Sequence, residues 1–311
     1  MSIQFGNAPC SWGTIEGFGE GVPALRMLDE LVQAGYRGTE LGDYGYLPTD
    51  VAELREVLSR RYLSMLAAYE GVNLRDPAAH ADGEARVLRT ARQLRAVADL
   101  GDPEWQPLLV LADEHSRDPA RSLNAGRITP GLALNEADWQ TFTAGAERLA
   151  RAVRDETGLR TVFHHHCGGY VETPDEIAGF LARTDPTLIG LVFDTGHVLY
   201  GSGASEGGAV LDSLQRFRER VWYVHFKDVS AEVAARARAQ GLSYQQAVGA
   251  GVFCELGRGA VPFPAVLGRL EESGYQGWIT AEQDVLPGMG EPLLSAAANR
   301  RYLASLTRSR L

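Results

Sequence analysis

The sequence predicts an α/β protein that folds as one closed (β/α)8 barrel over residues 1–311. Short, almost continuously apolar segments alternate along the chain with longer segments whose apolar residues recur every three to four positions. The short segments are typical of parallel strands buried on both faces, and the long ones are typical of helices that cover such a sheet. Eight such units fit the roughly 250 residues that a closed barrel needs.

The predicted strands are short and rich in Val, Ile, Leu and aromatic residues, which favour extended structure. In chain order they cover residues 3–9, 38–42, 63–71, 107–113, 160–166, 188–197, 221–229 and 277–284.

Each strand is followed by a segment with helical periodicity. Asn135 stands at a helix-cap position, and Thr173 followed by Pro174 is a typical helix start. The predicted helices cover residues 22–36, 50–61, 84–101, 135–158, 173–184, 209–220, 263–275 and 291–310.

The length beyond a minimal barrel fits two longer excursions, at about 116–130 and 230–261, and no linker or repeat divides the chain. An open doubly wound sheet is the alternative architecture, but the GxGxxG turn typical of its first strand is missing.

Composition narrows the class of protein. The chain carries 30 Lys and Arg against 40 Asp and Glu, a formal net charge of −10, which argues against a nucleic-acid partner. No apolar run approaches the ~18 residues of a membrane span, and the N-terminus lacks the pattern of a secretory signal. Three scattered cysteines suit free thiols better than disulfides. We therefore expect a cytoplasmic protein, with a homo-oligomer left open.

Polar residues gather at the carboxyl ends of the predicted strands, where the chemistry of such barrels takes place. Five of the seven histidines follow strands five to seven. In strand order the set is Trp12, Glu40, Glu70, Asp113, Glu114, His115, His164, His165, His166, Asp194, His197, His225, Lys227, Asp228, Glu282 and Asp284.

Three members of this set, Asp194, His225 and Glu282, each follow an apolar strand, so their side chains should converge on the barrel axis. Taken singly, each has an ordinary structural explanation, such as a turn cap for Asp194 or a buried core residue for His225. Together, converging buried carboxylates repel one another unless a cation lies between them. Mixed carboxylate and imidazole ligands suit Mn²⁺ or Co²⁺, with Mg²⁺ or Zn²⁺ as alternatives.

Several motifs resemble the xylose-isomerase-like TIM-barrel superfamily of sugar isomerases and epimerases, and most closely its myo-inosose-2 dehydratase branch. The superfamily pieces are FDTGH (193–197) and AEQD (281–284), and the resemblance covers nearly the whole chain. APCSWG (8–13) and the histidine-rich fifth strand followed by YVET (170–173) point to the branch.

The resemblance implies one divalent metal held by residues after strands five to eight, and Asp194, His225 and Glu282 match the last three positions. The family's strand-five glutamate is absent, and the histidine run stands in its place. Either Glu172 folds back as the fourth ligand, which we favour, or one of the three histidines replaces it.

Side chains alternate along a strand, so His164 and His166 should face the barrel interior and His165 should face outward. We expect His164 to bind substrate, and His166 or Lys227 to handle protons. His197 should position the substrate or assist as an acid. Lys227 has the alternative role of an ion pair with Asp228 or Glu282. The remaining residues expected to line the substrate pocket are Trp12, Glu40, Glu70 and Asp228.

The expected activity is a metal-dependent dehydration of a polyhydroxylated cyclic ketone such as 2-keto-myo-inositol, with a small polyol or sugar as substrate. A sugar isomerase or ketose 3-epimerase is the alternative, since it starts from the same α-proton abstraction. An abasic-site endonuclease also occurs on this barrel, but the acidic charge argues against it. A barrel that binds ligands without catalysis is the fourth hypothesis.

Overall fold

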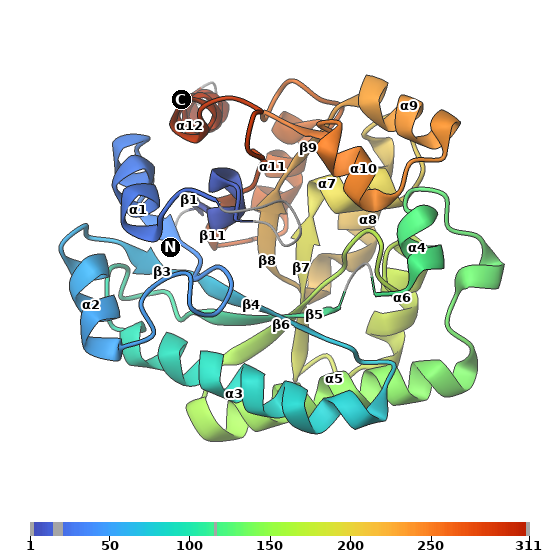
Figure 1. The fold of residues 1–311 in the computed structure, drawn as a ribbon, viewed down its shortest axis with the longest axis horizontal. Helices are drawn as coiled ribbons and strands as arrows, with labels where there is room; N and C mark the ends of the chain where they lie inside the picture. Colours follow the sequence, from blue (N-terminus) through green and yellow to red (C-terminus); the bar gives the residue numbers. More distant parts are fainter. Residues whose placement is uncertain (1–2, 15–20, 115–116, 309–311) are drawn as a thin grey trace.

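The computed structural model describes residues 3–14, 21–114 and 117–308, and it confirms the predicted barrel. Nine parallel strands form one sheet in the order β3-β2-β1-β11-β8-β7-β6-β5-β4 (Figure 1). The strands are β1 (Ile3–Asn7), β2 (Gly38–Thr39), β3 (Ser64–Met65), β4 (Ala67–Val72), β5 (Leu108–Asp113), β6 (Arg160–His164), β7 (Ile189–Asp194), β8 (Val221–Phe226) and β11 (Gly277–Ala281).

β3 and β4 are the two ends of the sheet, and they are consecutive segments of one predicted strand, 63–71. Leu66 separates them, and its N–H donates to the Thr39 carbonyl on one side (2.8 Å) while its carbonyl accepts from Leu108 N on the other (3.0 Å). The predicted eight strands and the observed nine therefore describe the same closed ring.

Helices pack around the barrel at the positions that the periodicity predicts (Figure 1). The N-cap Asn135 accepts from Asp138 N (2.9 Å), and Thr173 forms a capping box with Glu176. The helices are α1 (Ala24–Gln33), α2 (Val51–Ser59), α3 (His80–Val97), α5 (Glu136–Thr157), α6 (Pro174–Arg183), α8 (Gly208–Phe217), α11 (Phe263–Glu272) and α12 (Pro292–Arg308).

The two predicted excursions carry extra elements at the carboxyl ends of the strands. The first holds α4 (Pro119–Leu123). The second holds α9 (Ala231–Gln240) and α10 (Tyr244–Gly249), framed by a short antiparallel pair, β9 (Asp228–Val229) and β10 (Phe253–Cys254). A short helix, α7 (Thr195–Gly201), follows β7.

Six predicted strands run past the carboxyl ends of the observed ones, and for two of them the cause is clear. The predicted strand 221–229 divides at Lys227, and its last two residues leave the barrel to pair with β10. The first strand ends at Asn7, because Pro9 begins a 3-10 turn that runs to Trp12. No helix among the described residues is long and apolar enough to cross a membrane.

Candidate active site at the carboxyl ends of the strands

A cavity of ≈ 160 Å³ opens at the carboxyl ends of the barrel strands. This volume is below the range typical of drug-sized ligands, so the cavity suits one small molecule. Its lining includes Glu40, His164, His166, His197, His225, Lys227, Glu282 and Asp284 from the predicted set, together with Cys10, Asp43, Tyr69, Tyr244 and Gln245.

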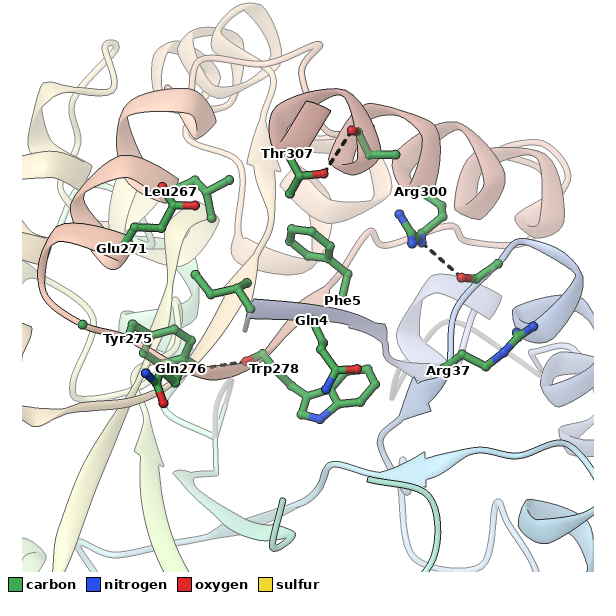
Figure 2. Close-up of a pocket in the computed structure, with 14 residues that line it drawn as sticks. Gln4, Phe5, Arg37, Leu267, Glu271, Tyr275, Gln276, Trp278, Arg300 and Thr307 are labelled. Carbon is green, nitrogen blue, oxygen red and sulfur yellow. Dashed lines mark hydrogen bonds between the residues drawn. The ribbon is translucent and has the colours of Figure 1, made fainter. Parts of the chain in front are cut away.

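A larger hollow of ≈ 790 Å³ lies between β1, α11 and α12, lined by Phe5, Trp278 and Arg300 among others (Figure 2). It contains none of the predicted site residues. It lies beside the amino-terminal ends of β1 and β11, the end of such barrels that serves stability more than catalysis.

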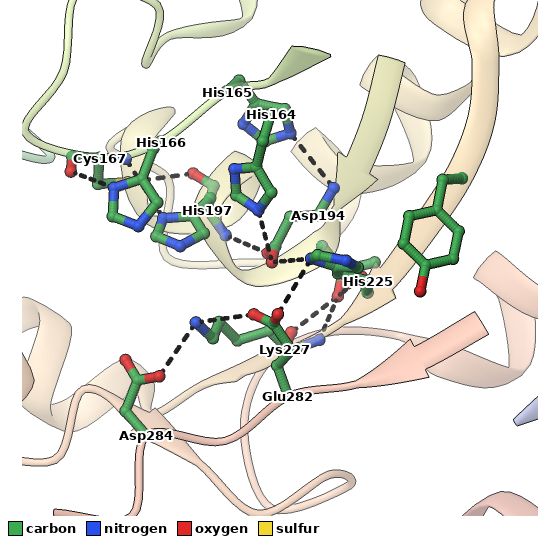
Figure 3. Close-up of polar contacts among 12 residues, drawn as sticks. His164, His165, His166, Cys167, Asp194, His197, His225, Lys227, Glu282 and Asp284 are labelled. Carbon is green, nitrogen blue, oxygen red and sulfur yellow. Dashed lines mark hydrogen bonds and ion pairs between the residues drawn. The ribbon is translucent and has the colours of Figure 1, made fainter. Parts of the chain in front are cut away.

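Asp194, His225 and Glu282 converge as predicted (Figure 3). Asp194 lies opposite His225 in the β7–β8 register, and Glu282 follows directly after β11 on the other side of β8. His225 Nδ1 is 3.7 Å from Asp194 Oδ2 and 3.2 Å from Glu282 Oε1. All three residues are buried, so their charges interact with little screening by water.

Glu40 orients the ring of His225 from the opposite side. His225 Nε2 lies 2.9 Å from Glu40 Oε1, and Tyr223 donates its hydroxyl to the same oxygen at 2.9 Å. Because a carboxylate only accepts, Nε2 carries a proton, and Nδ1 is the ring nitrogen that faces Asp194 and Glu282. Glu40, expected to bind substrate, therefore sits where it holds the imidazole in place.

The carboxylates around His225 favour its positively charged form. Burial lowers the pKa of His225, but the carboxylates of Glu282 and Glu40 outweigh that effect and raise it to about 9. Burial raises the pKa of Asp194 to about 6. Burial also acts to raise the pKa of Glu282, but His225 and Lys227 together bring it below its ordinary value.

The structure corrects the prediction for the fourth member of the cluster. Glu172 is buried away from the cavity, and its two carboxylate oxygens accept from the backbone N–H groups of Gly126 (2.6 Å) and Gly168 (2.7 Å). His164, the last residue of β6, instead brings its Nε2 to 3.8 Å from Asp194 Oδ2. The loop after β6 turns too soon for Glu172 to reach the cluster.

The neighbouring histidines follow the predicted alternation. His164 and His166 line the cavity, whereas the buried His165 faces the wall, where its Nε2 accepts from Asp194 N at 3.3 Å. His197 lies beside His166, with 4.0 Å between the ring centroids. Burial lowers the pKa values of both His164 and His197, so both rings are neutral near pH 7.

Lys227 lies in the cavity wall between two carboxylates, 3.2 Å from Glu282 Oε2 and 3.1 Å from Asp284 Oδ1. Burial lowers its pKa, but Asp284 and Glu282 more than offset this and hold the pKa well above its ordinary value. Gly196 makes room for the side chain, since a Cβ there would lie 2.7 Å from Lys227 Cγ. The predicted pairing with Glu282 is confirmed.

The alternative partner, Asp228, has a different role. Its carboxylate accepts four backbone N–H bonds, from Val229, Gly257, Gly259 and Val261, at 2.8–3.0 Å. It thus holds the turn after β10 and does not line the cavity, contrary to the prediction of a substrate contact.

Two more predicted pocket residues point elsewhere. Trp12 is buried beneath α1, where its Nε1 donates to Glu30 Oε2 at 2.8 Å. Glu70 faces α3 and accepts from Thr90 Oγ1 at 2.5 Å. The preceding residue on β4, Tyr69, faces the cavity instead, because side chains alternate between the two faces of a strand and Glu70 faces outward. His115 lies outside the described residues.

The cavity also contains residues that were not predicted. Tyr69, like Glu70, lies near the end of the third predicted strand, so the same observation could have found it. Its side chain points to the opposite face of the strand from that of Glu70. Tyr244 and Gln245 lie on α10, well beyond the end of β8 at Phe226, and no pattern in the sequence marks them.

Residues 28–306 match the model of the family described as xylose isomerase-like TIM barrel. The chain belongs to this family. Over 305 residues it is 29% identical to the inosose dehydratase of Lacticaseibacillus casei, covering 97% of each chain.

Two solved structures share the family's fold with this chain. The IOLI protein with a bound zinc atom superposes with a TM-score of 0.69 at 13% identity, covering 99% of each chain. The D-allulose 3-epimerase of Methylomonas sp. in complex with D-allulose gives a TM-score of 0.66 at 18% identity, covering 98% of this chain and 97% of the other.

The donor set of this family member fits a divalent cation. Asp194 Oδ2 and His225 Nδ1 are buried and have no hydrogen-bond partner among the described residues. Ligand atoms drawn from Glu40, His225 and Glu282, and from His164, Asp194 and His197, lie within 4.8 Å of one another in each group. A cation would satisfy buried polar atoms that lack a partner in such an acidic cluster.

Proposed function

We propose that the chain is a divalent-metal-dependent dehydratase that removes water from a polyhydroxylated cyclic ketone such as 2-keto-myo-inositol. The observation that carries the proposal is the buried cluster of His164, Asp194, His225 and Glu282 with the Lys227 ammonium beside it. The inosose dehydratase relative, aligned over almost the whole chain, supports the choice of substrate.

His164 Nε2, Asp194 Oδ2, His225 Nδ1 and Glu282 Oε1 would hold the cation. When bound, it supplies Lewis-acid polarisation of the ketone, which acidifies the neighbouring C–H. We propose Mn²⁺ or Co²⁺ as this metal, because mixed carboxylate and imidazole ligands suit both.

His166 would take the α-proton. Its Nδ1 donates to the Cys167 carbonyl at 2.9 Å, so in the neutral ring Nε2 is the nitrogen that accepts. Nε2 lies 3.5 Å from the Tyr244 hydroxyl, and both residues line the cavity, so a bound ring would meet the acceptor there.

Lys227 and His197 act as donors. The ammonium of Lys227 would protonate the departing β-hydroxyl, so that one water leaves and an enol remains that tautomerises to a dione. His197 Nδ1 accepts from Cys167 N at 3.3 Å, which leaves the proton on Nε2 to donate to a substrate oxygen.

A metal-dependent sugar isomerase or ketose 3-epimerase is the second candidate. The likeness to the D-allulose 3-epimerase favours it, and so does the presence of a proton acceptor and a proton donor in one cavity. It would share the first proton transfer and differ in where the proton returns.

The two candidates separate in one experiment. Purified protein is analysed for metal, then incubated with inosose and ketose panels in D₂O with Mn²⁺ or Co²⁺ and followed by NMR. Dehydration yields a dione, whereas epimerisation places deuterium on a carbon with no loss of water. Asp194→Ala and Glu282→Ala should lose the metal, and the exposed Asp175→Ala should keep it. Full metal occupancy in both site variants would refute the assignment.

We also propose that the chain works as a single domain in the cytoplasm, in inositol catabolism. The three free cysteines agree with a reducing compartment.

A further inference from the structure

The second excursion is anchored at its base and reaches over the cavity. Asp228 and Val229 pair with Cys254 and Phe253, and Ser230 N donates to the Val252 carbonyl at 2.9 Å. Between these anchors, α9 and α10 extend toward α4 of the first excursion (Figure 1).

The two excursions are joined by polar contacts. Arg127, just after α4, donates to the carbonyls of Ala237 (3.3 Å) and Leu242 (3.2 Å) at the end of α9. Ser122 of α4 donates its hydroxyl to Gln245 Oε1 of α10 at 2.7 Å. These contacts fix α10 before any ligand arrives, which lowers the cost of ordering it on binding.

The first two residues of α10 form part of the cavity wall. A capping box between Ser243 and Gln246 fixes the start of the helix. Tyr244 then packs edge-on against the His166 ring, with centroids 5.2 Å apart, and Gln245 lies beside it in the wall. The helix therefore contributes the wall next to the proton acceptor, on an element outside the barrel strands.

Among the residues that line the cavity, Gln245 is the one with a side-chain amide. Its carbonyl oxygen is taken by Ser122, so its NH₂ group is the part that can serve a ligand. A cyclic polyol carries hydroxyls around its whole rim, and those away from the metal cluster lose their water when they enter the cavity. Each needs a new partner, because a buried hydroxyl without one is costly.

We propose that Gln245 is a substrate-binding, specificity-determining residue whose amide N–H donates to a ring hydroxyl away from the reacting carbons, and that Ser122 is the positioning residue that orients it. This inference rests on the proposed function for its substrate class, a neutral cyclic polyol.

The test compares Gln245→Met, which keeps the length of the side chain but removes the amide, with the exposed Gln240→Ala on α9 as control. Turnover is measured with inosose and with a panel of monodeoxy inososes. Binding is measured separately by calorimetry with myo-inositol, which has no ketone and cannot react. Thermal unfolding checks that each variant folds.

We expect Gln245→Met to lower kcat/KM for inosose about 10-fold, mainly through KM, as the loss of one neutral hydrogen bond predicts. It should weaken myo-inositol binding by a similar factor, and the loss should vanish for one deoxy analogue only. Ser122→Ala should show a smaller loss of the same kind, and the double variant should lose no more than Gln245→Met alone.

Unchanged KM and myo-inositol affinity in a folded Gln245→Met variant would overturn the inference while leaving the proposed function intact. A wild-type protein that binds myo-inositol through Gln245 but converts no inosose would overturn the proposed function alone. A wild-type protein that neither binds nor converts these compounds would overturn both.

Discussion

Replacing Arg121 with methionine should destabilise the fold far more than breaking an ordinary surface ion pair. The guanidinium is 1% exposed and donates two bonds to Glu176, at 2.7 and 2.9 Å. Its Nε also donates to the Gly169 carbonyl at 2.8 Å, so one side chain connects α4, the loop after β6 and the start of α6. Methionine fills the volume but leaves the Glu176 carboxylate without its counter-ion.

The expected loss is about 3–5 kcal/mol of unfolding free energy, the usual cost of leaving one partner of a buried pair uncompensated. For a chain of this length that corresponds to a fall of roughly 5–8 °C in Tm. The double variant Arg121→Met/Glu176→Gln should recover part of the lost stability. The neutral Gln amide keeps an acceptor for the Thr173 N–H but removes the buried charge.

A matched control uses Asp175, the neighbour of Glu176 on α6. Arg216 pairs with Asp175 at 2.8 Å, but these side chains are 49% and 91% exposed. Arg216→Met should therefore change the unfolding free energy by less than about 1 kcal/mol. Urea denaturation of the four proteins provides the measurement. If Arg121→Met loses no more stability than Arg216→Met, the buried pair does not stabilise this loop as we describe.

Three further outcomes are expected. His164→Ala should lose bound metal while Glu172→Gln retains it, as measured by elemental analysis; the reverse order would restore Glu172 as the ligand. Lys227→Met should lower kcat by roughly 10²–10⁴-fold with the metal retained, because the proton donor is lost while the carboxylates remain; a variant with wild-type kcat would remove Lys227 from the chemistry. Burial raises the pKa of Asp113 to about 7, so the folded protein keeps a proton that the unfolded chain loses near pH 4. The unfolding free energy should therefore fall as the pH rises from about 4 to 7, by up to about 1.4 kcal/mol per unit of pKa shift. Asp113→Asn should flatten that part of the pH profile, and an unchanged slope would contradict this account.

Most of the barrel was predictable, because strands buried on both faces and amphipathic helices leave clear periodicities. The convergence of Asp194, His225 and Glu282 was predictable for a related reason. Parallel strands in a closed ring all end at one rim, so polar residues that follow neighbouring strands must meet.

The predictions that were wrong concern Glu172, Asp228 and Glu70. The position of each of these side chains depends on the local direction of the backbone and not on the order of the strands. Glu172 is only six residues beyond His166, but the intervening turn sends its carboxylate to the N–H groups of Gly126 and Gly168. Asp228 follows a barrel strand in sequence, but the chain has already left the barrel there to pair with β10. Glu70 and Tyr69 differ by one position, and that single step moves a side chain from one face of the sheet to the other.

The sequence by itself determined the barrel, the rim on which the polar residues gather and the convergence of Asp194, His225 and Glu282, because each follows from local periodicity and strand order. The short motif HHH (164–166) also determined which of its rings face inward, since alternation along a strand is a local property. Only the tertiary structure decided that His164, rather than Glu172, lies beside Asp194, and that Tyr244 and Gln245 form part of the wall. Those contacts join segments far apart in the chain, and their geometry depends on how loops pack, which no local pattern encodes.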